Sequence, residues 1–229
     1  RIGGRRAGGR KAGLIAAAIM ATSPIFIDQA GTVSIDLAFS VTVLASLNAL
    51  IAWRQDKNLA WVGLAAVLAG SGCGIRHTGY VTCVLLATIV LFTRDRRWVS
   101  ANLTFLGLTF LTALPWLLRS AVLVNNPFYP FFINVFSPGS LPDTDITAVA
   151  SHESIRNVGL LGLLRFPWDI VMHPEWYDGW TKSPGPLVLL LGVPGLFVGG
   201  KRCRMVGGFA IAGGVLLFFF RQFARYLLP

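Results

Sequence analysis

Seven long runs of apolar residues dominate this sequence. They are separated by short polar or basic stretches and lie near residues 12–27, 35–53, 59–74, 78–92, 99–118, 186–199 and 205–220. A helix of about 20 apolar residues crosses the roughly 30 Å hydrocarbon core of a bilayer, and flanking residues can extend the shorter runs. Because lipid offers the backbone no hydrogen-bonding partner, spans this apolar must be helical. The runs therefore predict an all-α fold, a polytopic transmembrane helical bundle with about seven spans.

The distribution of charge indicates which partners the chain has. Only 13% of residues are charged, 54% are hydrophobic, and the formal net charge is +10. Basic residues that bind nucleic acid gather in a stripe on a water-facing domain. Here they form short clusters between the apolar runs, which is the arrangement that marks the cytoplasmic face of a membrane protein. We therefore expect membrane lipids as partners and no nucleic acid.

The same clusters predict an orientation. When the loops are assigned alternately to two sides, one side receives 13 basic and two acidic residues, and the other receives seven basic and eight acidic residues. Lys and Arg are enriched in cytoplasmic loops. This places the N-terminus in the cytoplasm and the C-terminus outside, in a multi-pass protein of the inner (plasma) membrane.

The runs divide the chain into three parts. Residues 1–118 hold the first five predicted spans, residues 119–184 form a long extracytoplasmic loop, and residues 185–229 hold the last two spans. Within the loop, residues 158–172 mix Leu, Phe and Trp with one Arg and one Asp, a pattern that favours a helix lying at the membrane interface. Because the chain begins with Arg and ends with Pro, we expect it to be an internal fragment.

Self-contained catalytic motifs are scarce in the sequence. It has no Walker loop and no zinc-protease motif. The three cysteines show no paired spacing, so neither a disulfide framework nor a zinc site is predicted.

Polar residues at the predicted outer ends of the helices are the main candidates for a site. Asp36 is either an acid in the first turn of a helix, where it favours the helix dipole, or a carboxylate that faces a substrate or metal. Arg76 and His77 lie in a short outer turn. They either bind a phosphate at headgroup depth or anchor the turn to the interface.

Three motifs, in this order, resemble one enzyme family. They are residues 23–38, which include Ser-Pro-Ile-Phe and Ser-Ile-Asp-Leu-Ala, residues 68–79, which end in Gly-Ile-Arg-His-Thr-Gly, and residues 114–131, from Leu-Pro-Trp-Leu-Leu-Arg to Asn-Pro-Phe-Tyr-Pro-Phe. Residues 167–187 and the closing Arg-Tyr-Leu-Leu-Pro are also similar to the family. This family is the multi-spanning, C-type superfamily of bacterial polyprenyl-phosphate-sugar-dependent glycosyltransferases, which includes protein O-mannosyltransferases and aminoarabinose transferases.

The resemblance implies a membrane enzyme that transfers a sugar from a polyprenyl-phosphate donor to an acceptor at the outer face of the membrane. It implies that Asp36 is catalytic and that a divalent metal could take part. It also implies that the donor is bound by the residues Arg76, His77, Tyr129, Arg221 and Arg225. The acidic pair of the family's first outer loop is absent from this chain, so the fragment is expected to be inactive alone.

Two departures from the family pattern concern the proposed site. The family's Lys in the second motif is matched by Arg76 or His77, and its Pro after the Asp is matched by Ala38. Arg keeps the two-pronged geometry that binds phosphate, whereas a neutral His does not.

Two other functions fit the same pattern of spans. A transporter or lipid flippase also has kinked helices and polar residues at span ends, but it commonly places charges near the bilayer midplane. The predicted spans have no ionisable residue at their centres. The remaining alternative is a non-catalytic membrane subunit.

The predicted topology can be tested by cysteine labelling in intact cells. Single cysteines at Arg96 and Lys201 should be shielded from an impermeant thiol reagent, because both positions lie in basic, cytoplasmic loops. Cysteines at Ser140 and Ser183 should be labelled. Labelling of Lys201→Cys from outside would contradict the seven-span topology.

Overall fold

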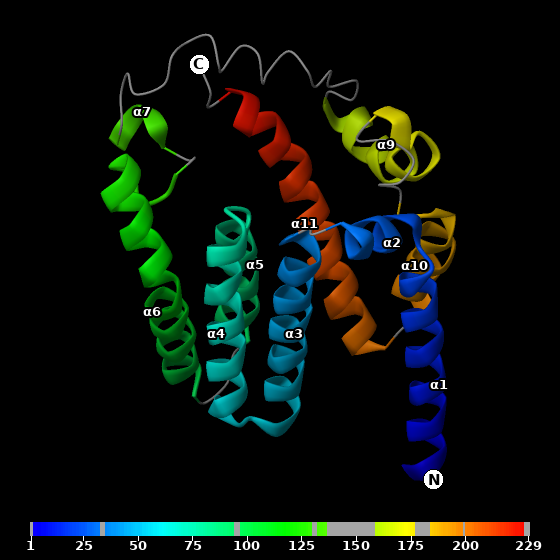
Figure 1. Cartoon of the computed structure of the whole chain (residues 1–229). Coiled ribbons are helices and arrows are strands. Elements are labelled where there is room, and N and C mark those ends of the chain that lie inside the picture. The colour runs from blue at the N-terminus through cyan, green and yellow to red at the C-terminus, as the bar shows by residue number, and fades with distance from the viewer. Residues whose placement is uncertain are drawn as a thin grey trace. The chain divides into compact units, whose positions relative to one another are not determined.

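The computed structural model describes residues 2–32, 35–93, 97–129, 132–136, 159–176, 184–198 and 200–226. All regular elements in these ranges are helices (Figure 1), which confirms the predicted all-α class. The chain divides into two compact units. One consists of Arg1–Leu37 and Ile155–Cys203, and the other of Ala38–Ser154 and Arg204–Pro229.

The larger unit is built around three mutually packed helices. These are α4 (Leu59–Ile75), α5 (Gly79–Leu91) and α6 (Trp98–Val124). In Figure 1, α4 and α5 form an antiparallel hairpin. The unit also contains the short helix α7 (Ile133–Phe136) and most of α3 (Ile35–Asp56) and α11 (Lys201–Tyr226).

The smaller unit contains α1 (Ile2–Ala21), α2 (Pro24–Gly31), α9 (Gly159–Met172), the 3-10 helix η1 (Pro174–Trp176) and α10 (Pro186–Val198). Helix α9 contacts both η1 and α10.

A sharp bend of 65° separates α1 from α2. Pro at the first position of α2 lacks the N–H that would continue the hydrogen-bonding ladder of α1, so the helix breaks here. The Ser23 hydroxyl donates instead to the Met20 carbonyl oxygen at 2.7 Å.

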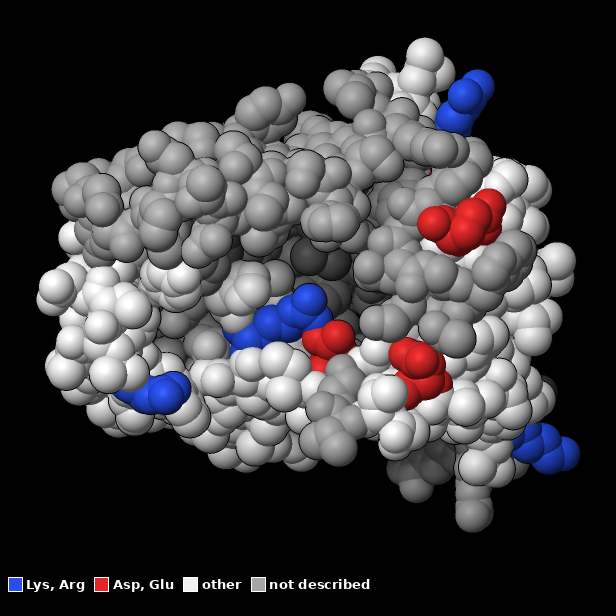
Figure 2. Space-filling view, turned by 45° about the horizontal axis from the view of Figure 1, so that its top comes forward, with Lys and Arg blue, Asp and Glu red and all other residues white. Residues whose placement is uncertain are grey.

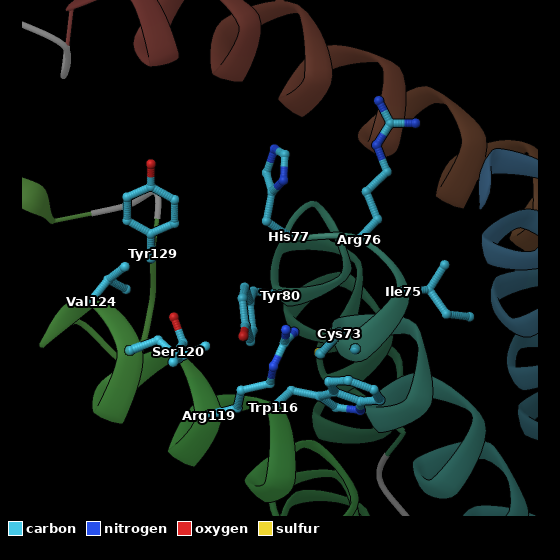
Figure 3. A pocket seen from close by; sticks show the side chains of 12 residues that line it. Cys73, Ile75, Arg76, His77, Tyr80, Trp116, Arg119, Ser120, Val124 and Tyr129 are labelled. Carbon is cyan, nitrogen blue, oxygen red and sulfur yellow. The ribbon is translucent and has the colours of Figure 1, made fainter. Parts of the chain in front are cut away.

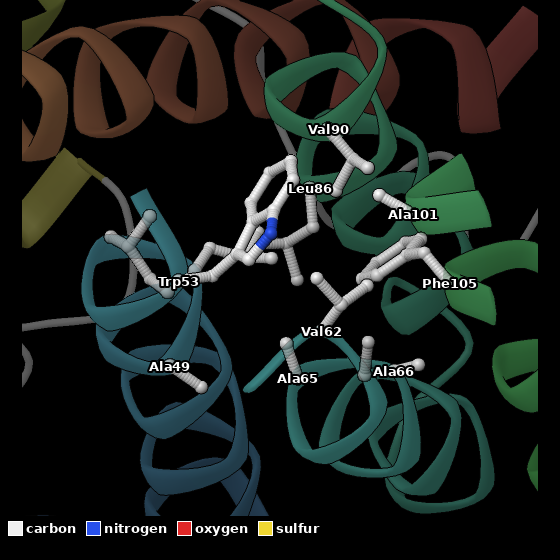
Figure 4. Packing of buried hydrophobic residues seen from close by; sticks show 12 residues of the cluster. Ala49, Trp53, Val62, Ala65, Ala66, Leu86, Val90, Ala101 and Phe105 are labelled. Atoms are coloured by element: carbon white, nitrogen blue, oxygen red, sulfur yellow. The ribbon is translucent and has the colours of Figure 1, made fainter. Parts of the chain in front are cut away.

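The hydrophobic core of the larger unit lies between α3, α4, α5 and α6 (Figure 4). Its fully buried members include Trp53 and Leu50 from α3, Leu86 from α5 and Phe105 from α6. Met205 and Phe209 of α11 pack against this cluster. The Ser46 hydroxyl donates to the Ala65 carbonyl oxygen at 2.8 Å, which satisfies a buried polar group and joins α3 to α4.

Small residues bring α4 and α6 close together. A Cβ atom added at Gly70 would lie 2.6 Å from the Thr109 carbonyl oxygen and 2.8 Å from the Thr112 Cβ. One turn earlier on α4, the Ala66 carbonyl oxygen accepts a hydrogen bond from the Thr109 hydroxyl at 3.3 Å. Membrane helices associate through close packing of this kind, because lipid tails are as apolar as the helix surfaces.

Charged side chains are sparse on the described surface. Figure 2 shows a face on which a few Lys, Arg, Asp and Glu residues stand among uncharged ones. Many large apolar side chains of α6 are exposed, among them Leu103 at 68% and Val122 at 81%. Such a surface suits contact with lipid, as the sequence predicts for a membrane protein.

The number of membrane spans differs from the prediction of seven. Within the described residues, only α3 and α6 are both long and apolar enough to cross a bilayer, and the bent pair α1 and α2 raises the number to three. The predicted runs do form helices, but α4, α5 and α10 have only 17, 13 and 13 residues. The turn at residues 76–78 ends α4 and separates it from α5, which leaves two short helices. By length and composition, the described part of the chain therefore holds two or three candidate spans.

The bounds of two helices can be compared with those predicted from the sequence. Helix α6 continues to Val124, so Arg119 is helical although the long loop was expected to begin there. Helix α9 covers Gly159–Met172 and nearly coincides with the helix expected at residues 158–172. Its predicted place at the membrane interface stays a prediction.

The packing of α4 on α6 can be tested by substitution of single glycines. Gly70→Ala should destabilise the protein by about 1–3 kcal/mol, because the added methyl group collides with backbone atoms that cannot move independently. The thermal unfolding midpoint of the purified protein measures the effect.

Gly63→Ala is the matched control. It lies on the same helix and faces the same neighbour, but its added Cβ would meet only the Leu108 Cδ1 atom, at an ordinary 3.5 Å. Equal midpoints for the two variants would show that the close approach at Gly70 is not needed.

Candidate functional site

A pocket of about 300 Å³ lies within the larger unit, where α4 and α6 end and α5 begins (Figure 3). Its described lining residues come from the end of α4, the following turn, the start of α5 and the last turns of α6. They are Cys73, Gly74, Ile75, Arg76, His77, Tyr80, Trp116, Arg119, Ser120, Leu123, Val124 and Tyr129.

A tight turn carries two of the polar residues. Helix α4 ends as the Arg76 N–H donates to the Gly72 carbonyl oxygen at 3.1 Å, and the Gly79 N–H donates back to the Arg76 carbonyl oxygen at 2.8 Å. A Cβ atom at Gly79 would lie 2.6 Å from the Gly72 carbonyl oxygen, so only glycine permits this close return of the chain. Figure 3 shows Arg76 and His77 extending beyond the helix ends from this turn.

The opposite wall comes from α6. Trp116, Arg119 and Ser120 lie on its last turns and extend toward α4 and α5 (Figure 3). Gly74 leaves room for Trp116, because a Cβ atom there would overlap the indole ring. The kink expected from Pro115 within α6 lies next to these residues.

A buried asparagine shapes the segment that carries Tyr129. Asn126 is fully buried; its Oδ1 atom accepts the Phe128 N–H at 2.9 Å, and its carbonyl oxygen accepts the Ser120 hydroxyl at 2.8 Å. The preceding Asn125 ends α6 in the left-handed conformation, with φ 53°. These bonds turn the chain back toward the helix ends and bring Tyr129 to the pocket.

An aromatic cluster supports this segment. The Phe128 ring meets the Tyr80 ring edge to face, with centroids 6.1 Å apart, and it also contacts the rings of Phe132 and Phe136. Edge-to-face pairs of this kind each contribute about 0.5–1.5 kcal/mol beyond their buried area.

Positive charge in the pocket comes from two guanidinium groups, those of Arg76 and Arg119. His77 is exposed at the rim, yet the surrounding atoms partly withdraw its ring from water. This desolvation is the larger of two causes that lower the pKa of His77 below its ordinary value, and the positive charge of Arg76 is the smaller. At neutral pH the ring is therefore neutral, and it can act as a hydrogen-bonding partner rather than a second cation.

This combination of groups suits a ligand that has one anionic group, such as a phosphate, on an otherwise less polar molecule. None of the described lining residues is acidic, whereas two guanidinium groups, the hydroxyls of Tyr80 and Tyr129, and an indole N–H can donate hydrogen bonds. Arg in particular binds phosphate oxygens in a bidentate manner. The volume is at the lower end of the roughly 300–1,000 Å³ typical of small-molecule sites.

The structure brings together three of the residues singled out in the sequence. Arg76, His77 and Tyr129 line this one pocket. Asp36 lies in the first turn of α3, is half-buried, and is not among the lining residues. Arg221 and Arg225 lie in α11, but their side chains are outside those that the structure describes.

A metal site is not evident among the described residues, where no three His, Cys, Asp or Glu side chains gather. The divalent metal considered from the sequence therefore has no ligand set in this part of the chain, and we derive no chemical step through it.

Sequence reasoning missed three polar or aromatic residues of the pocket, namely Tyr80, Trp116 and Ser120, and it placed Arg119 at the outer membrane surface without assigning it to a site. Arg119 and Trp116 belong to the Leu-Pro-Trp-Leu-Leu-Arg motif, which was the available signal. Because the sequence placed Arg119 at the start of a loop, its position on a helix that lines the same pocket as Arg76 could not be foreseen.

Comparison with known families gives one match. A sequence model described as dolichyl-phosphate-mannose-protein mannosyltransferase matches residues 3–118. The matched range includes the α4 to α5 turn and Trp116, and it ends just before Arg119. No curated protein and no solved structure matches the chain.

The Asn126 turn gives a prediction about stability. Asn126→Ala should lower the free energy of unfolding by about 1–3 kcal/mol, because it removes a fully buried side chain and leaves the Phe128 N–H without its acceptor. Asn102→Ala, within α6, is the control, since the Asn102 amide makes an exposed hydrogen bond to the Trp98 carbonyl oxygen. Thermal unfolding of both variants tests this, and an unchanged midpoint for Asn126→Ala would contradict a structural role for the turn.

Proposed function

Because this chain belongs to the dolichyl-phosphate-mannose-protein mannosyltransferase family, a family of membrane glycosyltransferases, we propose that its pocket holds the phosphate of a polyprenyl-phosphate sugar donor. The enzyme then transfers the sugar to an acceptor at the outer face of the membrane. The observation that carries the proposal is that Arg76 and Arg119 both line one cavity, and that none of the described residues lining it is a carboxylate.

The position of the pocket along the bundle supports a lipid-linked substrate. Helix α4 begins just after Arg54 and Asp56 end α3, and it leads to Arg76 at its other end. Its 17 residues span about 25 Å at 1.5 Å per residue, close to the roughly 30 Å of a hydrocarbon core. Arg54 and Arg76 are thus proposed to lie at opposite membrane surfaces. A polyprenyl phosphate keeps its tail in lipid and its phosphate at one surface, where a pocket at the helix ends can bind it.

Each polar residue has a proposed role in donor binding. Arg76 and Arg119 bind the phosphate oxygens through charge-assisted hydrogen bonds. The neutral His77 and the hydroxyl of Tyr129 complete the contacts from the rim. Arg221 and Arg225, four residues apart on α11, are proposed as further donor contacts.

Asp36 is proposed as the carboxylate that accepts a proton from the acceptor hydroxyl as that oxygen attacks the sugar. It occupies the first turn of α3, at the opposite end of that helix from Arg54. The positive end of the helix dipole favours its ionised form, which is the form a general base requires.

The proposal includes the topology inferred from the sequence. In it the protein is a multi-pass protein of the inner membrane. Its N-terminus lies in the cytoplasm, and the pocket and the C-terminus lie outside.

Donor binding tests the assignment of Arg76. In the intact protein, Arg76→Ala should weaken affinity for a polyprenyl-phosphate sugar by roughly tenfold to a hundredfold, the equivalent of about 1.5–3 kcal/mol for one charge-assisted contact. Isothermal titration in lipid nanodiscs measures the affinity.

Arg54→Ala is the matched control for charge. It removes the same charge at the other end of the bundle, where the described contact of its guanidinium group is the Met205 sulfur at 3.0 Å. Donor affinity should then stay near that of the wild type. Equal affinities for the two variants would overturn the proposed phosphate site.

Substitution of Asp36 by Asn separates its two possible roles. If Asp36 only favours the helix dipole, removal of its charge costs about 0.3–1 kcal/mol of stability and leaves most activity. As the proposed base, Asp36→Asn should lower turnover strongly while expression stays unchanged. Turnover within about threefold of wild type, a barrier change under roughly 0.7 kcal/mol, would assign Asp36 a purely structural role.

A further inference from the structure

Two cysteine thiols meet at the floor of the pocket. Cys73 of α4 and Cys83 of α5 are ten residues apart in sequence, and their sulfur atoms are 3.4 Å apart. Both sulfurs also lie near the Ala69 carbonyl oxygen, at 3.8 Å for Cys73 and 3.2 Å for Cys83. Each cysteine is a free thiol in this structure. The spacing along the chain gave no sign of this pair, because it arises only when the α4 to α5 hairpin closes.

The two sulfur atoms lie close enough to form a disulfide bond after a small movement. A disulfide has an S–S distance of about 2.05 Å, so the two atoms need to approach by only a little more than 1 Å. They lie on helices that already pack together. Side-chain rotation with a small adjustment of α5 can supply this movement.

The pocket also gives access to the pair. Cys73 lines the cavity, although only 7% of its surface is exposed, and Cys83 is half-buried behind it. A small molecule that enters the pocket can therefore reach the Cys73 sulfur, whereas a folded protein cannot. Thiols that only fill space in a core lack such an opening.

We propose that Cys73 and Cys83 are a modification site, a thiol pair that a small disulfide compound converts into an intramolecular disulfide. The Cys73 thiolate attacks one sulfur of the small disulfide, and the first thiol leaves. The Cys83 thiolate then attacks the Cys73 sulfur of this mixed disulfide, and the second thiol leaves. The two protons of the cysteines end on the released thiols, and the two electrons lost by the cysteines reduce the small disulfide.

The bond should alter the pocket, because the hairpin has little room to adjust. Gly79 already lies against the Gly72 backbone, so the start of α5 cannot move closer to α4 there. Any adjustment of α5 that draws Cys83 toward Cys73 is therefore expected to shift the turn that carries Arg76 and His77. The effect on donor binding rests on the proposed function, but formation of the disulfide does not.

Peptide mapping tests the modification without any donor. The intact protein in nanodiscs is treated with oxidised glutathione and digested with trypsin without reduction. Because Arg76 lies between the two cysteines, trypsin separates them, and a Cys73–Cys83 disulfide leaves two peptides joined until reductant is added. We expect the joined peptides in the wild type and their absence in Cys83→Ser. Two separate peptides in the oxidised wild type would overturn the proposal.

Donor binding tests the regulation. Affinity for a polyprenyl-phosphate sugar should fall at least threefold on oxidation and return with dithiothreitol, and oxidation should leave the affinity of the double variant Cys73→Ser/Cys83→Ser unchanged. Joined peptides with unchanged affinity would overturn the regulatory part. A reduced wild type that binds no donor would instead refute the proposed function and leave the peptide result standing.

Discussion

The close approach of α4 and α6 is the constraint on which the rest of the larger unit depends. It is possible because Gly70 and Ala66 present almost bare backbone to Thr109. In lipid, apolar side chains gain little by leaving the solvent, so helices associate where their surfaces fit at short range. A single methyl group at Gly70 would separate the two helices. Since the pocket is bounded by the ends of these helices, their separation also sets its width.

Local hydrogen bonds then fix the polar rim of the pocket. Asn126 shows how this works, because it is fully buried and still pairs its side chain and its carbonyl oxygen within a few residues of α6. A buried amide left unpaired would cost several times the net gain of an ordinary hydrogen bond. The chain therefore leaves α6 along one path, and Tyr129 returns to the helix ends. The Gly72 and Gly79 contact restricts the facing turn in the same way.

Sequence reasoning recovered the helices better than their lengths. Apolar runs mark segments that avoid water, and the predicted runs are helical, although the run at 12–27 is broken into α1 and α2. They do not show where a helix ends, because an end depends on turn residues such as Gly79 and Pro24 that interrupt apolar runs without changing their hydropathy. Among the described residues, only α3 and α6, or three spans if the bent pair α1 and α2 counts as one, are long and apolar enough to cross a bilayer, where seven runs had predicted seven.

The candidate site was only partly predictable for a related reason. Arg76, His77 and Tyr129 stand out because they are polar residues between apolar segments, and the structure brings them to one cavity. Trp116 and Arg119 lie on a continuous helix, where a polar side chain is commonly an interfacial anchor. Only the crossing of α6 against α4 shows that these two face the turn. Tertiary packing also creates the Cys73 and Cys83 pair, which no spacing rule identifies.

The charge state of the pocket limits what it can bind. With His77 neutral at physiological pH, the fixed positive charge comes from guanidinium groups, which remain protonated at any pH a cell experiences. An anion that enters the cavity can accept charge-assisted hydrogen bonds from these groups, whereas a neutral sugar cannot form such contacts. A phosphodiester is suited to them, because its negative charge is independent of pH in this range. In the proposed function, the cavity therefore recognises the donor through its phosphate, and other contacts select the sugar and the acceptor.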